Sequence, residues 1–199
     1  MTDQFQTRYT LLKRAKDPKD EAAWTEFFAY YKTFIYMLMR QMKVPQQDCD
    51  DLTQAVLLKV WKKLETFDPE RAKFRTWFST LIRNTVINHW DSVSRRQKRI
   101  EKYGESTIEP PTGLPSTPEF DAMFQREWEA YITNLAMSNI RPGCSKNALR
   151  VFELVMQEVP TSEIAIRLDL NPSTVSTLKG RVLEKLVREV RRLRSELEL

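Results

Sequence analysis

Asp51-Leu-Thr-Gln-Ala-Val-Leu-Leu-Lys-Val-Trp61 is the stretch that decides how the first half of this chain folds. At 100° per residue, its pattern predicts an amphipathic helix over residues 48–65. The predicted inner face carries the apolar residues Leu52, Val56, Leu57, Val60, Trp61 and Leu64. The predicted outer face carries Asp51, Gln54, Leu58, Lys62 and Glu65. We therefore expect one face to pack on a helical core and the other to meet solvent or a partner.

Leu58 is an apolar residue on the polar face of this helix. A lone exposed leucine is ordinary on a protein surface. A leucine ringed by acid, amide and basic side chains is also typical of the centre of a helix-binding surface. The residues alone leave both interpretations open.

A long helix is predicted before this stretch and another after it. The first opens at Asp17-Pro18 and Asp20 and ends before Pro45. It carries a stripe of large apolar residues that we expect to form core. The stripe comprises Trp24, Phe27, Phe28, Tyr31, Phe34, Ile35 and Leu38. The other helix follows a polar turn between Phe67 and Phe74 and runs to about Lys102.

The helix after the turn also separates two faces. Its predicted inner face carries Phe74, Trp77, Phe78, Leu81, Ile82, Val86 and Val93. Its predicted outer face carries Thr76, Thr80, Arg83, Ile87, Trp90 and Asp91, with Asn84 at the edge. A basic cluster, Arg95-Arg96-Gln-Lys98-Arg99, follows. Two interpretations of Trp90 stay open, a stacking surface for a base or packing against the first helix.

A proline-rich segment separates the two halves of the chain. Glu109-Pro-Pro-Thr-Gly-Leu-Pro-Ser-Thr-Pro118 cannot continue a helix, because proline lacks the amide donor and clashes with the preceding turn. Ser116-Thr-Pro-Glu119 is then typical of a new helix start. We predict an all-α fold with two small helical domains, residues 1–102 and 118–199, joined by a flexible linker over residues 103–117.

The second domain is predicted to end in a helix-turn-helix. A short helix with Ile164 and Ala165 is followed by the turn Asp169-Leu-Asn171, and Pro172 starts the next helix. The outer face of that helix carries Ser173, Thr177, Arg181, Glu184 and Arg188. Short hydroxyls followed by arginines suit phosphates and base edges in a major groove. A helical hairpin with a solvated charged face is the alternative.

Charge and composition limit the classes of function that we expect for this chain. The net charge of +5 in 199 residues favours a polyanionic partner only modestly. Cys49, Cys144 and the single histidine, His89, fit no common zinc pattern, so we expect free thiols in a reducing compartment. No phosphate-cradling glycine loop or nucleophile motif is present, so we expect no catalysis, metal or cofactor. Without a signal sequence or a membrane-length apolar run, a cytoplasmic protein is expected.

Taken in order, these motifs resemble the sigma-70 family of RNA polymerase sigma factors, of the extracytoplasmic-function (group four) type. The resemblance rests on Asp51-Leu-Thr-Gln54, Leu58-Lys-Val-Trp61, Phe67-Asp68, Phe74-Arg-Thr-Trp77 and Ile82-Arg-Asn84. It covers nearly the whole chain and implies two helical domains joined by a linker. It also implies a transcription initiation factor without catalysis of its own, whose partners are core RNA polymerase and promoter DNA.

The resemblance implies roles for particular residues. The first domain would dock on the clamp helices of the largest polymerase subunit through Asp51, Gln54, Leu58 and Lys62. It would open and read the downstream (−10) promoter element through Phe67, Arg75, Thr76, Arg83, Asn84, Arg95, Arg96 and Lys98. The second domain would bind the upstream (−35) element through Ser173, Thr174, Thr177, Arg181 and Arg188. An anti-sigma factor is a further expected partner, since family members are commonly held inactive by one.

The sequence departs from the family pattern at several positions. Asp169 stands where glycine is common, Ser176 and Leu178 where basic residues are usual, and Asn88 where aspartate is usual. These departures leave the promoter sequence and the individual base contacts open. Two other functions are compatible with parts of the chain: a helix-turn-helix regulator with a helical sensor domain, and a helical adaptor without promoter-dependent activity.

Overall fold

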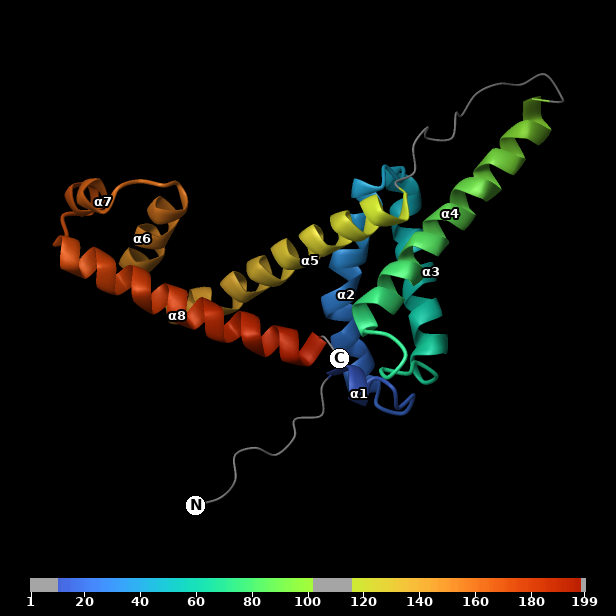
Figure 1. Cartoon of the computed structure of the whole chain (residues 1–199), viewed down its shortest axis with the longest axis horizontal. Helices are drawn as coiled ribbons and strands as arrows, with labels where there is room; N and C mark the ends of the chain where they lie inside the picture. Colours follow the sequence, from blue (N-terminus) through green and yellow to red (C-terminus); the bar gives the residue numbers. More distant parts are fainter. Residues whose placement is uncertain (1–10, 102–115, 198–199) are drawn as a thin grey trace, which may run out of the picture. The chain divides into compact units, whose positions relative to one another are not determined.

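The computed structural model describes residues 11–101 and 116–197, with the side chains of residues 97–101 excepted. Every regular element within these ranges is helical, which confirms the all-α prediction (Figure 1). The first range holds α1 (Leu11–Arg14), α2 (Glu21–Gln41), α3 (Gln46–Leu64) and α4 (Phe74–Glu101). The second holds α5 (Thr117–Ile140), a 3₁₀ turn (Arg141–Gly143), α6 (Lys146–Met156), α7 (Thr161–Leu168) and α8 (Pro172–Leu197).

Local capping explains where several helices begin. The Asp20 carboxylate accepts a hydrogen bond from the Ala23 amide at 2.8 Å and so caps α2. The Ser145 hydroxyl accepts one from the Ala148 amide at 3.2 Å and caps α6. At the start of α5, Glu119 Oε2 accepts hydrogen bonds from the Ser116 amide and hydroxyl, both at 2.8 Å. The starts of α2 and α5 confirm the sequence-based predictions.

The contacts of the chain form two compact units, which divide α5 between Trp128 and Glu129 and α8 between Ser195 and Glu196. In the first unit, α3 contacts both α2 and α4. Its core is aromatic: the rings of Phe27 and Tyr31 stack with centroids 4.2 Å apart, and those of Phe74 and Phe78 with centroids 5.4 Å apart. This packing holds α2, α3 and α4 in fixed register, which positions the two surfaces described below.

The first part of α5 belongs to the aromatic core of the first unit. Phe120, Phe124 and Trp128 are buried, and the Trp128 ring lies 4.9 Å from the ring of Phe34. The sequence-based boundary instead assigned all of residues 118–199 to the second domain. The difference arises because an apolar stripe shows that a helix packs but does not show on which core.

The second unit is built by α6, α7, the end of α5 and most of α8. Val151, Leu154, Ile164, Ala165 and Val175 form one buried cluster that joins α6, α7 and α8. The chain reverses after α7 at Asp169, whose φ of 52° and ψ of 51° are left-handed. Aspartate adopts this conformation more readily than most residues, so it replaces glycine in the turn. Pro172 begins α8, as predicted.

None of the helices within the two described ranges combines the length and apolarity that crossing a bilayer requires.

Candidate docking and nucleic-acid-binding surfaces

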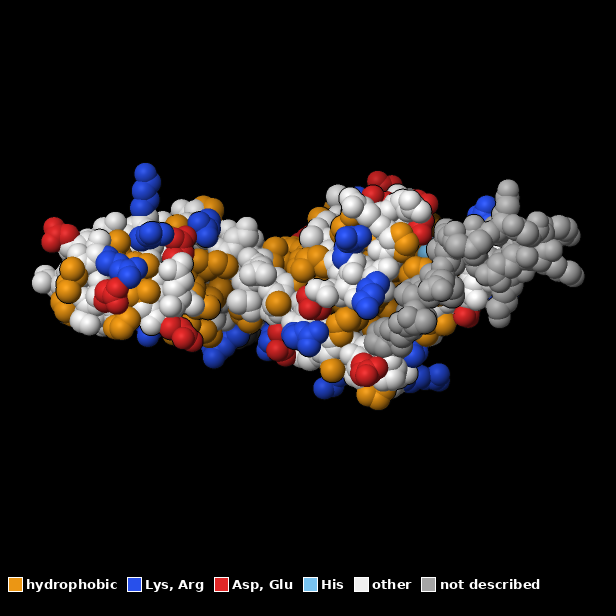
Figure 2. Space-filling model, turned by 90° about the horizontal axis from the view of Figure 1, so that it is seen from above, with side chains coloured by type: hydrophobic (Ala, Val, Ile, Leu, Met, Phe, Trp, Pro, Cys, Tyr) orange, Lys and Arg blue, Asp and Glu red, His pale blue; other side chains and the backbone are white. Residues whose placement is uncertain are grey.

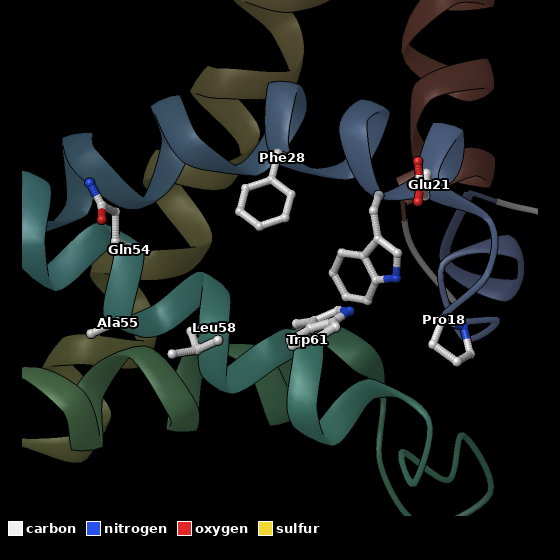
Figure 3. A pocket seen from close by; sticks show the side chains of 8 residues that line it. Pro18, Glu21, Phe28, Gln54, Ala55, Leu58 and Trp61 are labelled. Carbon is white, nitrogen blue, oxygen red and sulfur yellow. The ribbon is translucent and has the colours of Figure 1, made fainter.

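An apolar groove of about 750 Å³ lies between α2 and α3. It is lined by Pro18, Glu21, Trp24, Phe28, Gln54, Ala55, Leu58 and Trp61 (Figure 3). Phe28 of α2 is 38% exposed, and Leu58 and Trp61 of α3 are 47% and 46% exposed. Large apolar side chains left in solvent around a hollow are typical of a surface that a partner covers.

The groove contains two of the four residues predicted to dock a partner. Gln54 and Leu58 line it, while Lys62 lines a smaller neighbouring cavity of about 190 Å³. Asp51 is exposed on the same helix and lines neither hollow. Leu58 is therefore no isolated surface leucine, because it continues an apolar surface formed with Phe28 and Trp61.

Two aromatic residues of the groove were assigned to buried faces by the sequence-based prediction, and that assignment was wrong. Trp61 follows Leu58 by three positions and so lies only about 60° from it around the helix axis. Phe28 directly follows the fully buried Phe27, and adjacent helical residues point about 100° apart. These angular relations were the available signal that Phe28 and Trp61 border the exposed side. Trp24 is buried beneath them, with its ring centroid 6.5 Å from that of Trp61.

A second, more polar pocket of about 450 Å³ lies between α3 and α4. We refer to it as the amide pocket; its lining residues are Lys59, Lys63, Ala72, Thr76, Trp77, Thr80, Leu81, Asn84, Thr85 and Asn88. The structure thus brings together Thr76 and Asn84, both predicted site residues, and adds residues that the prediction missed. The missed signal is spacing: Thr76, Thr80, Asn84 and Asn88 recur every four residues and so share one face of α4.

The chemistry of the amide pocket suits an unstacked base. Asn84 and Asn88 can each donate and accept, which matches the mixed edge of a nucleobase. Trp77 offers a ring on one side, and Lys59 and Lys63 bring positive charge from α3. Lys59 Nζ also donates to Thr85 Oγ1 at 3.0 Å, which links the two helices beneath the pocket.

Other predicted residues of the first domain lie outside the amide pocket. Phe67 is buried, with its ring centroid 5.2 Å from that of Trp77, so it supports the pocket wall from behind. Arg75 is half-buried and donates to Gln125 Oε1 of α5 at 3.1 Å. Arg83 is also half-buried, and its buried Nε has no hydrogen-bond partner within the described part of the chain.

The basic end of α4 is only partly described. Arg95 and Arg96 are exposed, whereas the Lys98 side chain lies outside the described residues. Trp90 is buried, with 6% of its surface exposed, so its predicted place on the outer face was wrong and its ring is not a free stacking surface.

The predicted contact residues of α8 lie mostly in solvent. Ser173, Thr177, Arg181 and Arg188 are exposed, and Thr174 is half-buried. The Thr177 hydroxyl donates to the Ser173 carbonyl at 2.9 Å, and Arg188 pairs with Glu184 at 2.8 Å. Arg181, Lys185 and Arg188 border a pocket of about 330 Å³ beside Cys144. On the face seen in Figure 2, lysine and arginine side chains alternate with acidic and apolar ones instead of forming one continuous patch.

The two cysteines differ in environment. Cys49 is buried, its thiol donates to the Pro45 carbonyl at 3.3 Å, and burial raises the pKa of this thiol. Cys144 is only half-buried, and both thiols are free, as predicted. No cluster of three or more metal-ligating side chains occurs within the described ranges.

Comparison with known proteins identifies the family of the segment that carries most of the apolar groove and the amide pocket. The model of the family described as sigma-70 region 2 matches residues 27–96, which include all of α3 and most of α2 and α4. This part of the chain is therefore a sigma-70 region 2. Two curated relatives that match part of this chain are named extracytoplasmic-function RNA polymerase sigma factors. Residues 27–96 therefore carry the sigma-70 signature that the motifs predicted.

Two relatives show the extent of the similarity. The chain is 37% identical over 91 residues to the sigma factor RpoE of Cereibacter sphaeroides, over 44% of this chain and 50% of that protein. It is 23% identical over 91 residues to SigK of Mycobacterium tuberculosis, over 46% and 49% of the two chains. The chain thus spans about half the length of the curated relatives it matches.

A similar solved structure is that of CnrH in complex with the cytosolic domain of CnrY. It has 19% identity and a TM-score of 0.34, over 92% of this chain and 96% of that one.

Proposed function

We propose that this protein is a sigma factor that directs core RNA polymerase to specific promoters and helps to melt them. One observation carries the proposal: within the sigma-70 region 2, helix α3 borders both an apolar groove and the amide pocket. Leu58 faces the groove and its neighbour Lys59 lines the pocket, so a single rigid helix connects polymerase docking to capture of a base.

The groove is assigned to the clamp helices of the largest polymerase subunit. Phe28, Leu58 and Trp61 offer apolar surface, Gln54 lines the groove with them, and Asp51 and Lys62 add charged groups on the same helix. An apolar centre inside a polar rim is the usual anatomy of a specific interface. The centre supplies most of the affinity, and the rim orients the partner.

The amide pocket is assigned to a base of the downstream promoter element. Separating DNA strands costs stacking and pairing energy, which is offset when an unstacked base enters a pocket with hydrogen-bonding and stacking groups. Thr76 and Asn84 would contact the base edge, with Lys59 and Lys63 near the strand. Arg75, Arg83, Arg95, Arg96 and Lys98 remain candidates for the flanking backbone, and Phe67 acts as support for the wall. Melting would then need no nucleotide hydrolysis by this chain.

The second unit is assigned to the upstream promoter element. Ser173, Thr174, Thr177 and Arg181 lie in the first half of α8, which follows the turn at Asp169, and Arg188 lies one turn beyond that half. A helix in this position after a turn can enter a major groove, with hydroxyls and arginines reaching phosphates and bases. Two modest contacts on one chain gain affinity through effective concentration. Control by an anti-sigma factor and a cytoplasmic location are parts of the same proposal.

The competing functions explain less of the chain. A helix-turn-helix regulator that acts without polymerase would account for α7 and α8, but not for the sigma-70 region 2 at residues 27–96. A helical adaptor would use the groove and leave the amide pocket unused.

The proposal is tested by run-off transcription with core polymerase, with and without this protein, on a pooled promoter library. New, specific start sites that depend on the protein are expected, and their upstream sequences would reveal both promoter elements. DNA binding by the folded protein without any protein-dependent start site would refute the proposal and favour the regulator.

A further inference from the structure

Lys16, in the connection between α1 and α2, reaches across to the loop between α3 and α4. Its Nζ donates a hydrogen bond to the Phe67 carbonyl at 2.5 Å and lies 5.4 Å from the centroid of the Phe67 ring. The first contact is a charge-assisted hydrogen bond and the second is a cation–π contact. Both act on the same residue, 51 positions away in the sequence.

The Phe67 loop otherwise shows bonds among its own residues and to the adjoining helix end. Asp68 Oδ1 accepts from the Glu70 amide at 3.0 Å, and the Asp68 carboxylate pairs with Arg71 at 3.3 Å. The Phe67 amide donates to the Leu64 carbonyl at 3.1 Å. These bonds shape the loop locally, whereas Lys16 ties it to a distant part of the first unit.

Phe67 transmits the position of the loop to the amide pocket. Its ring centroid lies 5.2 Å from that of Trp77 and 5.8 Å from that of Phe74. Trp77 lines the amide pocket, and Ala72, from the same loop, lines it as well. A shift of Phe67 would therefore move two parts of the pocket wall together.

Lys16 lies beside the docking groove but does not line it. It lines the cavity of about 190 Å³ together with Trp24, Trp61 and Lys62. Trp24 and Trp61 line the apolar groove as well, so the Lys16 side chain lies between that groove and the Phe67 loop.

We infer that Lys16 is a positioning residue for the amide pocket: it holds Phe67, and through the Phe67–Trp77 contact it sets the wall against which an unstacked base lies. The inference rests on the proposed function, because the pocket has this role only in a protein that opens promoters. Lys16 touches neither the base nor the polymerase in this scheme; it acts through Phe67 and Trp77.

The test compares Lys16→Met, Lys16→Arg and the matched control Lys19→Met in the full chain. Methionine keeps an unbranched apolar side chain but removes the donor and the charge, whereas arginine keeps both. Lys19 is an exposed lysine of the same connection. For each variant we would measure affinity for core polymerase, the rate of open-complex formation on a promoter identified in the library, and amide hydrogen exchange over residues 66–73. Rates are normalised to the active fraction, so that a general loss of folded protein does not count.

Lys16→Met should slow promoter opening roughly fivefold and speed exchange in the loop, the size expected for a charge-assisted hydrogen bond at a half-exposed site. Its core affinity should stay within about twofold. Lys16→Arg keeps a hydrogen-bond donor and the positive charge, so it should behave as wild type, as should Lys19→Met. In combination with Asn84→Ala, the loss should be smaller than the product of the single losses, because both changes act on one pocket. Normal opening by Lys16→Met, or independent effects in the double variant, would overturn the inference. Failure of the wild-type holoenzyme to open any promoter would instead defeat the proposed function.

Discussion

Leu58→Asp is the substitution that most directly tests the docking groove. Complete burial of a leucine side chain is favourable by about 1.5–3 kcal/mol relative to leaving it in solvent. Leu58 is already about half-buried in the free protein, with 47% of its surface exposed. A partner can therefore recover roughly 1 kcal/mol from this side chain, and Leu58→Ala should weaken polymerase binding about fivefold.

Aspartate should cost considerably more than alanine at this position. A carboxylate enclosed by the groove and a docked helix would lose hydration without an opposite charge, and Glu21 already lines the same groove. An added penalty of about 2 kcal/mol brings the expected loss of affinity to roughly one hundredfold. Folding should be little affected, because surface substitutions usually change stability by less than about 0.5 kcal/mol.

The assay is equilibrium binding of labelled protein to core polymerase, with thermal unfolding measured in parallel. Met156→Asp is the matched control, since Met156 is a 68% exposed apolar residue of α6, outside the groove, and the change adds the same charge. An unchanged affinity for Leu58→Asp, or an equal loss for Met156→Asp, would refute the assignment of the groove.

Four other substitutions test separate parts of the structure. Asn84→Ala should slow open-complex formation about tenfold and leave duplex binding unchanged; equal losses in both assays would remove its role in the amide pocket. Arg181→Ala should weaken binding to the upstream element and lower the slope of log affinity against log salt by about one; an unchanged slope would count against a phosphate contact. For Asp20→Asn, the melting temperature should fall less steeply as the pH is lowered than it does for the wild-type protein. The Arg14 side chain lowers the pKa of Asp20 below its ordinary 3.8, so the stability that Asp20 contributes is complete above that value and lost as the pH falls through the lowered pKa; an equally steep acid loss in the variant would contradict this. Trp128→Ala should cost about 3–5 kcal/mol in denaturant unfolding of the first unit, and a loss under about 1 kcal/mol would contradict its place in that core.

Much of the local structure was predictable because its causes are local. The apolar spacing of residues 51–64 predicts α3, and the side chains of Asp20 and Ser145 predict the starts of α2 and α6 through their own hydrogen bonds to nearby amides. The left-handed turn at Asp169 likewise depends on one residue and its neighbours. The motifs between Asp51 and Asn84, side chains at fixed helical spacing, predicted the sigma-70 region 2 that the family model matches over residues 27–96.

The candidate site was only partly predictable. Asn84, Thr76, Gln54 and Leu58, which line the two hollows, were named through the resemblance to the sigma-70 family. Lys59 and Lys63 were missed, since they become part of a pocket only when α3 lies against α4.

The amino-acid sequence alone determined most of the helices, several of their starts and the sigma-70 character of residues 27–96, because periodicity, capping and motif spacing act within a few turns of one helix. Tertiary packing decided which core each apolar stripe joins and which aromatic side chains stay in solvent. Trp128 packs on Phe34 across a long separation in sequence, Trp61 borders a groove, and Phe67 is held by Lys16. These outcomes depend on the shapes of two or more elements in contact, and helical periodicity carries no information about the partner element.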